Sequence, residues 1–364
     1  MAWTAEDRRK YAPAIQEVLR QRMLVRLAAT IDTIDPPCKT GRPRDWSTVT
    51  MLGALWHLAR DGCVWRRLPV GPGLPPHQSV WSRFLRGRLR AVLDRALAVL
   101  VACRRLAAGR KRRPTAAIID TQSVKTGPQR GPRGYDAHKK VKGRKRVLMV
   151  DVEGDPLGVR VVPADVQDRD ALAALAPYLA AHPSLRLVWM DLGFAAERCG
   201  ELLARHGVVQ ELVGTVGRQG FVVEPRRWKV EQTFGCLQRY RRLRVDDEMS
   251  NETSRHTTVL ASLFMTGMRL ERRCRRGGGG IGWWRSLRLV ATSQTGVRAP
   301  AETTPWTRIT ARRRPSRGCF LEKPGSTRSR RACGAGFAGS SRSWWSKSSR
   351  RRWGAAATSG PVEP

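Results

Sequence analysis

Three acidic residues far apart in the chain, Asp120, Asp191 and Glu231, each lie among apolar residues. This placement is unusual in a chain that has only 30 acidic residues. A carboxylate in apolar surroundings is costly unless it is paired with a cation, hydrogen-bonded or bound to a metal ion. These residues are therefore the first candidates for catalytic chemistry, although each one taken alone is better explained by a salt bridge or a helix cap.

The segments that carry these residues predict how they meet. Asp120 lies within 116–124, a short segment that begins with apolar residues and is typical of a buried strand. Asp191 directly follows 186–190, which is also expected to be a strand, and Glu231 lies in a helix expected over about 227–240. If the two strands are neighbours, their ends bring both aspartates together, and a helix that crosses the sheet can add Glu231.

Such a cluster of carboxylates predicts a divalent metal site. Like charges a few ångströms apart raise one another's pKa, and a hard cation removes the repulsion. Mg²⁺ (or Mn²⁺) prefers oxygen ligands and keeps water molecules that can act as nucleophiles. Two such ions, about 3.5–4 Å apart, can stabilise the attacking and leaving oxygens of a phosphodiester. The expected chemistry is therefore metal-dependent cleavage of a phosphodiester, with two ions.

The composition of the chain points to nucleic acid as its partner. The 364 residues carry a formal net charge of +38 with a pI of about 11.5, and 41% of them are hydrophobic, which is enough for a packed core. A field of this sign attracts polyanions, although a basic surface is also common in proteins from GC-rich genomes. The eight scattered cysteines predict neither a zinc clip nor a disulfide framework. With no signal peptide or membrane span expected, the predicted location is cytoplasmic and nucleoid-associated.

Residues 1–110 predict an all-helical, helix-turn-helix-like DNA-binding domain. Helices are expected over 13–31, over 48–60 behind a Ser47 cap, and from about 77 to 100. The third helix is basic near its start, where four arginines (Arg83, Arg86, Arg88 and Arg90) occur. The alternative is a plain helical bundle with solvated arginines. Residues 104–114 are expected to be a basic linker that ends this domain.

Residues 111–271 predict an α/β domain, and residues 272–364 do not predict a folded one. Strands are expected over 116–124, 147–152, 157–162, 186–190 and 208–213, with helices over 171–181, 195–205 and 227–240. This alternation favours a mixed sheet with flanking helices. From 272 the chain is a low-complexity basic tail of Arg, Ser, Gly and Trp. Either a disordered tail that binds DNA or translation in a shifted reading frame accounts for that composition.

Residues 40–270 resemble the DDE transposases of bacterial insertion sequences, in particular the IS-five-type group. The matching segments are GRPRDW at 41–46, DGCVWRRLP at 61–69, IDTQSVKT at 119–126, GYDAHKKVKGRKR at 134–146, VQDRD at 166–170, and 227–243. Together they are specific, although no single one is. The sequence departs from the related pattern around the catalytic glutamate. The related pattern has Tyr, Arg, Glu and Lys at fixed positions. Arg227 occupies the Arg position, but Glu224 and Gln238 occupy the Tyr and Lys positions. Arg239, one residue after Gln238, is the candidate to replace the Lys.

The resemblance implies a ribonuclease-H-like fold and DNA transposition. Asp120, Asp191 and Glu231 would bind the metal, water would cleave DNA at the terminal inverted repeats, and a 3′-hydroxyl would attack target DNA. Self-association in a DNA complex is implied in the same way. A nuclease without strand transfer and an inactive DNA-binding remnant are the alternatives.

Basic residues near the predicted site are expected to bind the DNA backbone, because Lys and Arg position DNA without reading its sequence. Trp228 is expected in the core and Asp136 in a turn. The predicted DNA-binding residues are Arg42, Arg44, Arg66, Arg67, Lys125, Lys139, Lys140, Lys142, Arg144, Lys145, Arg146, Arg227, Arg239, Arg241 and Arg242.

Overall fold

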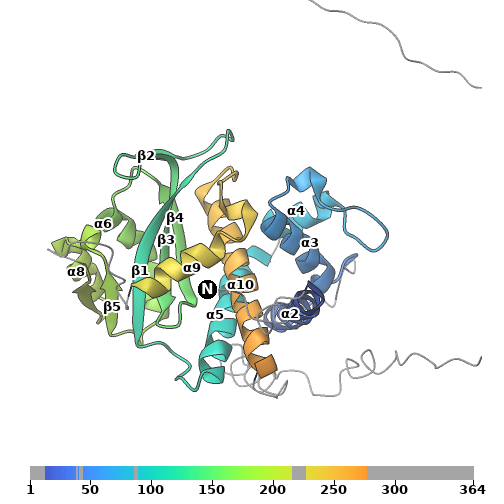
Figure 1. Cartoon of the computed structure of the whole chain (residues 1–364), viewed down its shortest axis with the longest axis horizontal. Coiled ribbons are helices and arrows are strands. Elements are labelled where there is room, and N and C mark those ends of the chain that lie inside the picture. The colour runs from blue at the N-terminus through green and yellow to red at the C-terminus, as the bar shows by residue number, and fades with distance from the viewer. Residues whose placement is uncertain (1–12, 38–39, 41–43, 86–88, 215–226, 277–364) are drawn as a thin grey trace, which may run out of the picture. The chain divides into compact units, whose positions relative to one another are not determined.

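A computed structural model describes residues 13–37, 40, 44–85, 89–214 and 227–276 (Figure 1). All of them fall within one compact unit, Met1–Thr303. The predictions for Arg42, Arg86, Arg88, Glu224 and the tail beyond Arg276 lie outside the described residues. In the part of the chain that the structure describes, no helix has a stretch long and apolar enough to span a bilayer.

The α/β region is built on one mixed sheet, as the sequence predicts, but among the described residues it has six strands where five were expected. The strands are β1 (Ala116–Lys125), β2 (Gly134–Asp136), β3 (Val141–Asp151), β4 (Pro156–Pro163), β5 (Leu187–Met190) and β6 (Val209–Leu212). The path β2-β3-β1-β5-β6 forms the sheet, and β4 pairs with β3. The β4, β3 and β1 strands are antiparallel, whereas β1, β5 and β6 are parallel. This mixed sheet with helices around it is consistent with a ribonuclease-H-like fold.

Short helices connect the parallel strands. The chain between β4 and β5 forms α6 (Asp168–Ala171), η2 (Leu172–Leu175) and α7 (Ala176–Ala181), so the helix expected over 171–181 is divided into three pieces. The chain between β5 and β6 forms η3 (Leu192–Phe194) and α8 (Glu197–Ala204). After β6 come α9 (Trp228–Leu237) and η4 (Arg241–Leu243).

Helices α2 (Pro13–Ile34), α3 (Thr48–Asp61), η1 (Trp65–Arg67), α4 (His77–Leu85) and α5 (Leu89–Ala107) precede the sheet. The predicted cap of α3 is confirmed, because the Ser47 hydroxyl accepts a hydrogen bond from the Thr50 amide at 3.1 Å. At the other end Gly62 has φ 71°, a conformation that favours glycine. The structure thus shows an N-terminal helical region of four α-helices among the described residues.

The single helix expected over about 77–100 is two helices, and the second one does not suit a DNA groove. Helix α5 packs against α2, α4, β4 and α10 (Asn251–Arg276), so it lies inside the protein. Its Arg90 donates to the His256 ring at 3.0 Å and to the Leu85 carbonyl at 3.1 Å. A helix that is packed on several sides cannot also lie in a DNA groove in this conformation.

The basic linker expected over 104–114 is also only partly a linker. Arg104 and Arg105 belong to the last turn of α5 and form ion pairs with the buried Asp155 and Asp151, respectively. Helix α10, which was not predicted from the sequence, contributes Arg269, whose guanidinium lies 3.3 Å from the Asp155 carboxylate. These buried carboxylates require cations, which explains why the arginines are held in the protein interior.

Candidate active site

The parallel pairing of β1 with β5 brings Asp120 and Asp191 to the same edge of the sheet. Ala116 lies opposite Leu187 and Ile118 opposite Trp189, so the same register continued by two residues places Asp120 opposite Asp191. Asp120 accepts a hydrogen bond from the Thr121 amide at 2.7 Å. Asp191 caps η3 and accepts from the Gly193 amide at 3.1 Å. The expectation that these two strands are neighbours is therefore confirmed.

Helix α9 brings Glu231 to this edge by packing against β1 and β3 (Figure 1). Val230 and Thr233 on its inner face are fully buried, and the Thr233 hydroxyl donates to the Gly154 carbonyl at 2.8 Å. Glu231 itself has an exposed side chain. Trp228 is 43% exposed, so the expectation that it belongs to the core is wrong.

Arg227 holds the three carboxylates together. Its Nη2 atom lies 3.8 Å from Oδ2 of Asp120, 4.0 Å from Oδ2 of Asp191 and 3.4 Å from Oε1 of Glu231. Since all three oxygens lie within 4.0 Å of the same nitrogen atom, they form one cluster. The buried Nε of Arg227 has no hydrogen-bond partner among the described residues. A single guanidinium group thus balances three carboxylates that would otherwise repel one another.

The site raises the pKa of Asp120 to about 6. Burial is the main cause, and the negative charge of Asp191 acts in the same direction. The Thr121 amide and the positive charges of Arg227 and Lys139 oppose this rise. The Asp120 carboxylate is therefore poorly stabilised by its surroundings and would gain from a further cation.

The donor chemistry of this site fits a hard divalent cation. All three groups offer carboxylate oxygens, which Mg²⁺ and Mn²⁺ prefer. In the conformation described, the positive charge among them is that of Arg227. Within residues 13–276, apart from their undescribed gaps, no three His, Cys, Asp or Glu side chains are arranged to hold a metal ion. A cation therefore fits these residues in donor type, provided that Arg227 moves away from them.

Several predicted DNA-binding residues have exposed side chains in the structure. They are Arg66, Arg67, Lys125, Lys139, Lys140, Lys142, Arg239 and Arg241. Lys139 is the one that acts on the site directly, because it lowers the pKa of Asp120 and its Nζ donates to the Thr121 carbonyl at 3.4 Å. Arg44 lies near Asp32 and Asp35, at 3.4 and 3.6 Å, so its charge is already balanced.

Four other predicted DNA-binding residues are buried, and a direct contact with DNA is wrong for them. Arg144 and Arg146 are 2% exposed, Lys145 is 5% exposed and Arg242 is 6% exposed. Arg144 pairs with Asp246 at 2.8 Å, and Lys145 with Asp168 at 2.7 Å. Arg242 pairs with Glu248 at 2.9 Å, and Arg146 donates to the Leu243 carbonyl at 2.8 Å. Arg144 and Arg146 thus join β3 to the segment between α9 and α10, and Lys145 joins β3 to the start of α6. Arg242 forms its ion pair within the segment between α9 and α10.

Arg227 was predicted to contact DNA, and its contact with the three carboxylates was not predicted. The signal was present, because Arg227 and Glu231 are four residues apart, a spacing that brings two side chains together on a helix. Asp136, which was expected in a turn, is the last residue of β2 and directly precedes the turn at 137–140. It accepts hydrogen bonds from the Ser123 hydroxyl at 2.6 Å and the Lys139 amide at 3.0 Å.

Comparison with known proteins gives matches over this same region. Residues 111–264 match the family described as the transposase DDE domain. A protein from Burkholderia cepacia, named as a transposase for insertion sequence element IS402, is 30% identical to this chain over 126 residues. That alignment covers 32% of this chain and 59% of the Burkholderia protein, so the chain spans less than two thirds of that relative.

Proposed function

We propose that this protein cleaves DNA at the ends of an insertion sequence and joins them to target DNA, because residues 111–264 match the transposase DDE domain family. The observation that carries the proposal is the convergence of Asp120, Asp191 and Glu231 within 4.0 Å of one Arg227 nitrogen. Three oxygen donors in a strongly basic protein are what metal-dependent phosphodiester chemistry requires.

Asp120, Asp191 and Glu231 would hold Mg²⁺ or Mn²⁺, with two ions proposed. When bound, the ions supply activation of the nucleophile and stabilisation of charge on the attacked phosphate. Arg227 would leave the carboxylates and turn its guanidinium to a DNA phosphate, for which its planar fork of donors is suited. Arg227 would thus balance the charge of the carboxylates when metal and DNA are absent, and the charge of a DNA phosphate when they are bound.

The exposed cations around the site would position the DNA. Lys125 ends β1, Lys139 and Lys140 lie in the β2–β3 turn, and Lys142 lies near the start of β3; all four are exposed. Contacts with phosphates fix the orientation of a duplex without reading its sequence. Recognition of the terminal repeats would therefore need contacts beyond these lysines.

A cleavage and joining assay tests the proposal. The substrate is DNA that carries the inverted repeats flanking the gene, incubated with Mg²⁺ and a target plasmid. Asp120→Asn, Asp191→Asn and Glu231→Gln should each reduce cleavage and joining to background. Asp170→Asn is the matched control, because Asp170 is exposed and pairs with Arg198 on the surface at 2.7 Å. Equal cleavage by wild type and Asp191→Asn would reject the assignment of the site.

The same assay separates the alternatives. A nuclease would give cut DNA without joined product, and an inactive remnant would bind the repeats without cutting them. We also propose that two protomers join the two element ends in one complex. Light scattering of the protein with and without repeat DNA would test that part separately.

A further inference from the structure

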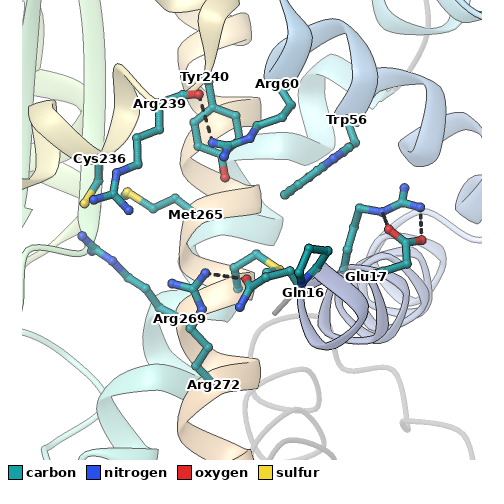
Figure 2. A pocket seen from close by; sticks show the side chains of 13 residues that line it. Gln16, Glu17, Trp56, Arg60, Cys236, Arg239, Tyr240, Met265, Arg269 and Arg272 are labelled. Atoms are coloured by element: carbon teal, nitrogen blue, oxygen red, sulfur yellow. Dashed lines mark hydrogen bonds and ion pairs between the residues drawn. The ribbon is translucent and has the colours of Figure 1, made fainter. Parts of the chain in front are cut away.

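A basic cavity lies away from the carboxylates, between α2, α3, the end of α9 and α10 (Figure 2). Its volume is about 400 Å³, which is within the range of small-molecule sites. Five arginines (Arg20, Arg60, Arg239, Arg269 and Arg272) line it together with a single carboxylate, Glu17. This excess of guanidinium groups indicates a site for an anion.

Two of these guanidinium groups have no acidic partner among the described residues. Arg60 donates to the Arg239 carbonyl at 2.9 Å and lies over the Tyr240 ring, 5.8 Å from its centroid. The Arg239 side chain is exposed and extends toward Cys236 in Figure 2. In contrast, Arg20 is paired with Glu17, and Arg269 with Asp155 at 3.3 Å. Arg60 and Arg239 are therefore the groups with charge to offer a ligand.

The rest of the cavity wall is aromatic and apolar. Trp56 is half-buried and packs edge-on against Tyr240 and Phe264, with ring centroids 6.0 and 5.2 Å apart. Met265 and Met268, which are buried, add polarisable surface. Aromatic side chains beside guanidinium groups suit a ligand with both a phosphate and a flat ring, because bases stack on such surfaces.

We propose that this cavity binds a nucleotide, with its phosphate at Arg60 and Arg239 and its base at Trp56. The nucleotide is either free in solution or part of a DNA strand. Binding here is independent of the carboxylate site, so it does not require the proposed transposition chemistry. The ligand would contact the C-terminal end of α9, the helix that carries Glu231 nearer its N-terminal end.

The test measures binding of a fluorescent dATP analogue to the full-length protein by anisotropy. Wild type should bind it saturably, and Arg60→Gln and Arg239→Gln should each weaken binding about tenfold or more, because each removes a charge-assisted contact. Trp56→Phe should also weaken it. Glu17→Gln should tighten binding, because it removes the only carboxylate among the described residues that line the cavity and releases Arg20. Damage to the fold would not produce that increase.

Controls and competitors complete the experiment. Arg205→Gln, at an exposed position on the surface after α8, should bind the analogue as wild type does, and so should Asp191→Asn. Displacement by unlabelled ATP but not by single-stranded DNA would support a free nucleotide, and displacement by the DNA would support a strand. Equal affinity in wild type, Arg60→Gln, Arg239→Gln and Arg205→Gln would overturn the proposal, as would displacement by inorganic phosphate as effective as that by ATP.

Discussion

Replacing Arg144 tests whether the basic β3 strand serves the fold or DNA. Arg144 is buried, and its guanidinium pairs with Asp246 at 2.8 Å and donates to the carbonyls of Glu248 at 2.7 Å and Pro132 at 2.9 Å. Arg144→Ala would leave the Asp246 carboxylate, which is 2% exposed, without its cation. Removal of one partner of a buried ion pair costs about 3–5 kcal/mol, which is a large part of the stability of an ordinary domain.

Lys142 is the matched control, because it lies two residues earlier in the same strand and is exposed. Lys142→Ala should change the free energy of unfolding by less than about 0.5 kcal/mol. It should instead weaken DNA binding evenly across sequences and lower the salt dependence by about one phosphate contact.

Urea denaturation and salt-dependent DNA binding of both variants give the answer. A double variant, Arg144→Met with Asp246→Asn, should lose less stability than Arg144→Ala, because no buried charge remains unpaired. If Arg144→Ala kept the unfolding midpoint of wild type and lost only DNA affinity, the structural role assigned to Arg144 would be refuted.

Three other predictions concern the site and its supports. In metal-free buffer, Asp120→Asn should be more stable than wild type above about pH 6 and equal to it below about pH 4. The Asp120 pKa of about 6 lies above its ordinary 3.8, so the buried charge disfavours folding only at high pH, by on the order of 2–3 kcal/mol; a pH-independent difference in unfolding free energy would contradict this. Ser47→Ala should cost about 1 kcal/mol in urea denaturation, because the Thr50 amide loses its acceptor; no change would show that the cap contributes nothing. Gly143→Ala should prevent normal folding, because a methyl group there collides with the Val124 carbonyl across the β1–β3 pair; a native circular dichroism spectrum and unfolding midpoint would argue against that collision.

The convergence of Asp120 and Asp191 could be predicted from the sequence because it depends on local patterns. Two short apolar segments predict strands, and an aspartate at the matching position of each meets the other once the strands pair in parallel. Glu231 was expected to join them from a helix over about 227–240 that crosses the sheet. The local pattern of each short segment was therefore enough to predict that these three residues meet.

The burial of the arginines in β3 could not be predicted in this way. Arg144 reads as a surface cation, and its partner Asp246 is 102 residues later in the chain. Helix α10 was also missed, because buried hydroxyl residues are interspersed among its buried apolar residues, such as Leu260 and Phe264. Thr258 and Ser262 satisfy their hydroxyls on carbonyls one turn earlier, at 2.9 and 2.8 Å, so they are buried without a distant partner.

The parallel register between β1 and β5 has a consequence for how such a sequence can change over time. The connection that leads from one strand to the other can gain or lose residues without moving either aspartate, because only the paired residues fix the alignment. One residue added between Trp189 and Asp191 would instead turn the second aspartate to the opposite face of the sheet. Insertions are therefore tolerated in the loops between these strands, whereas the few positions just before each aspartate must keep their number.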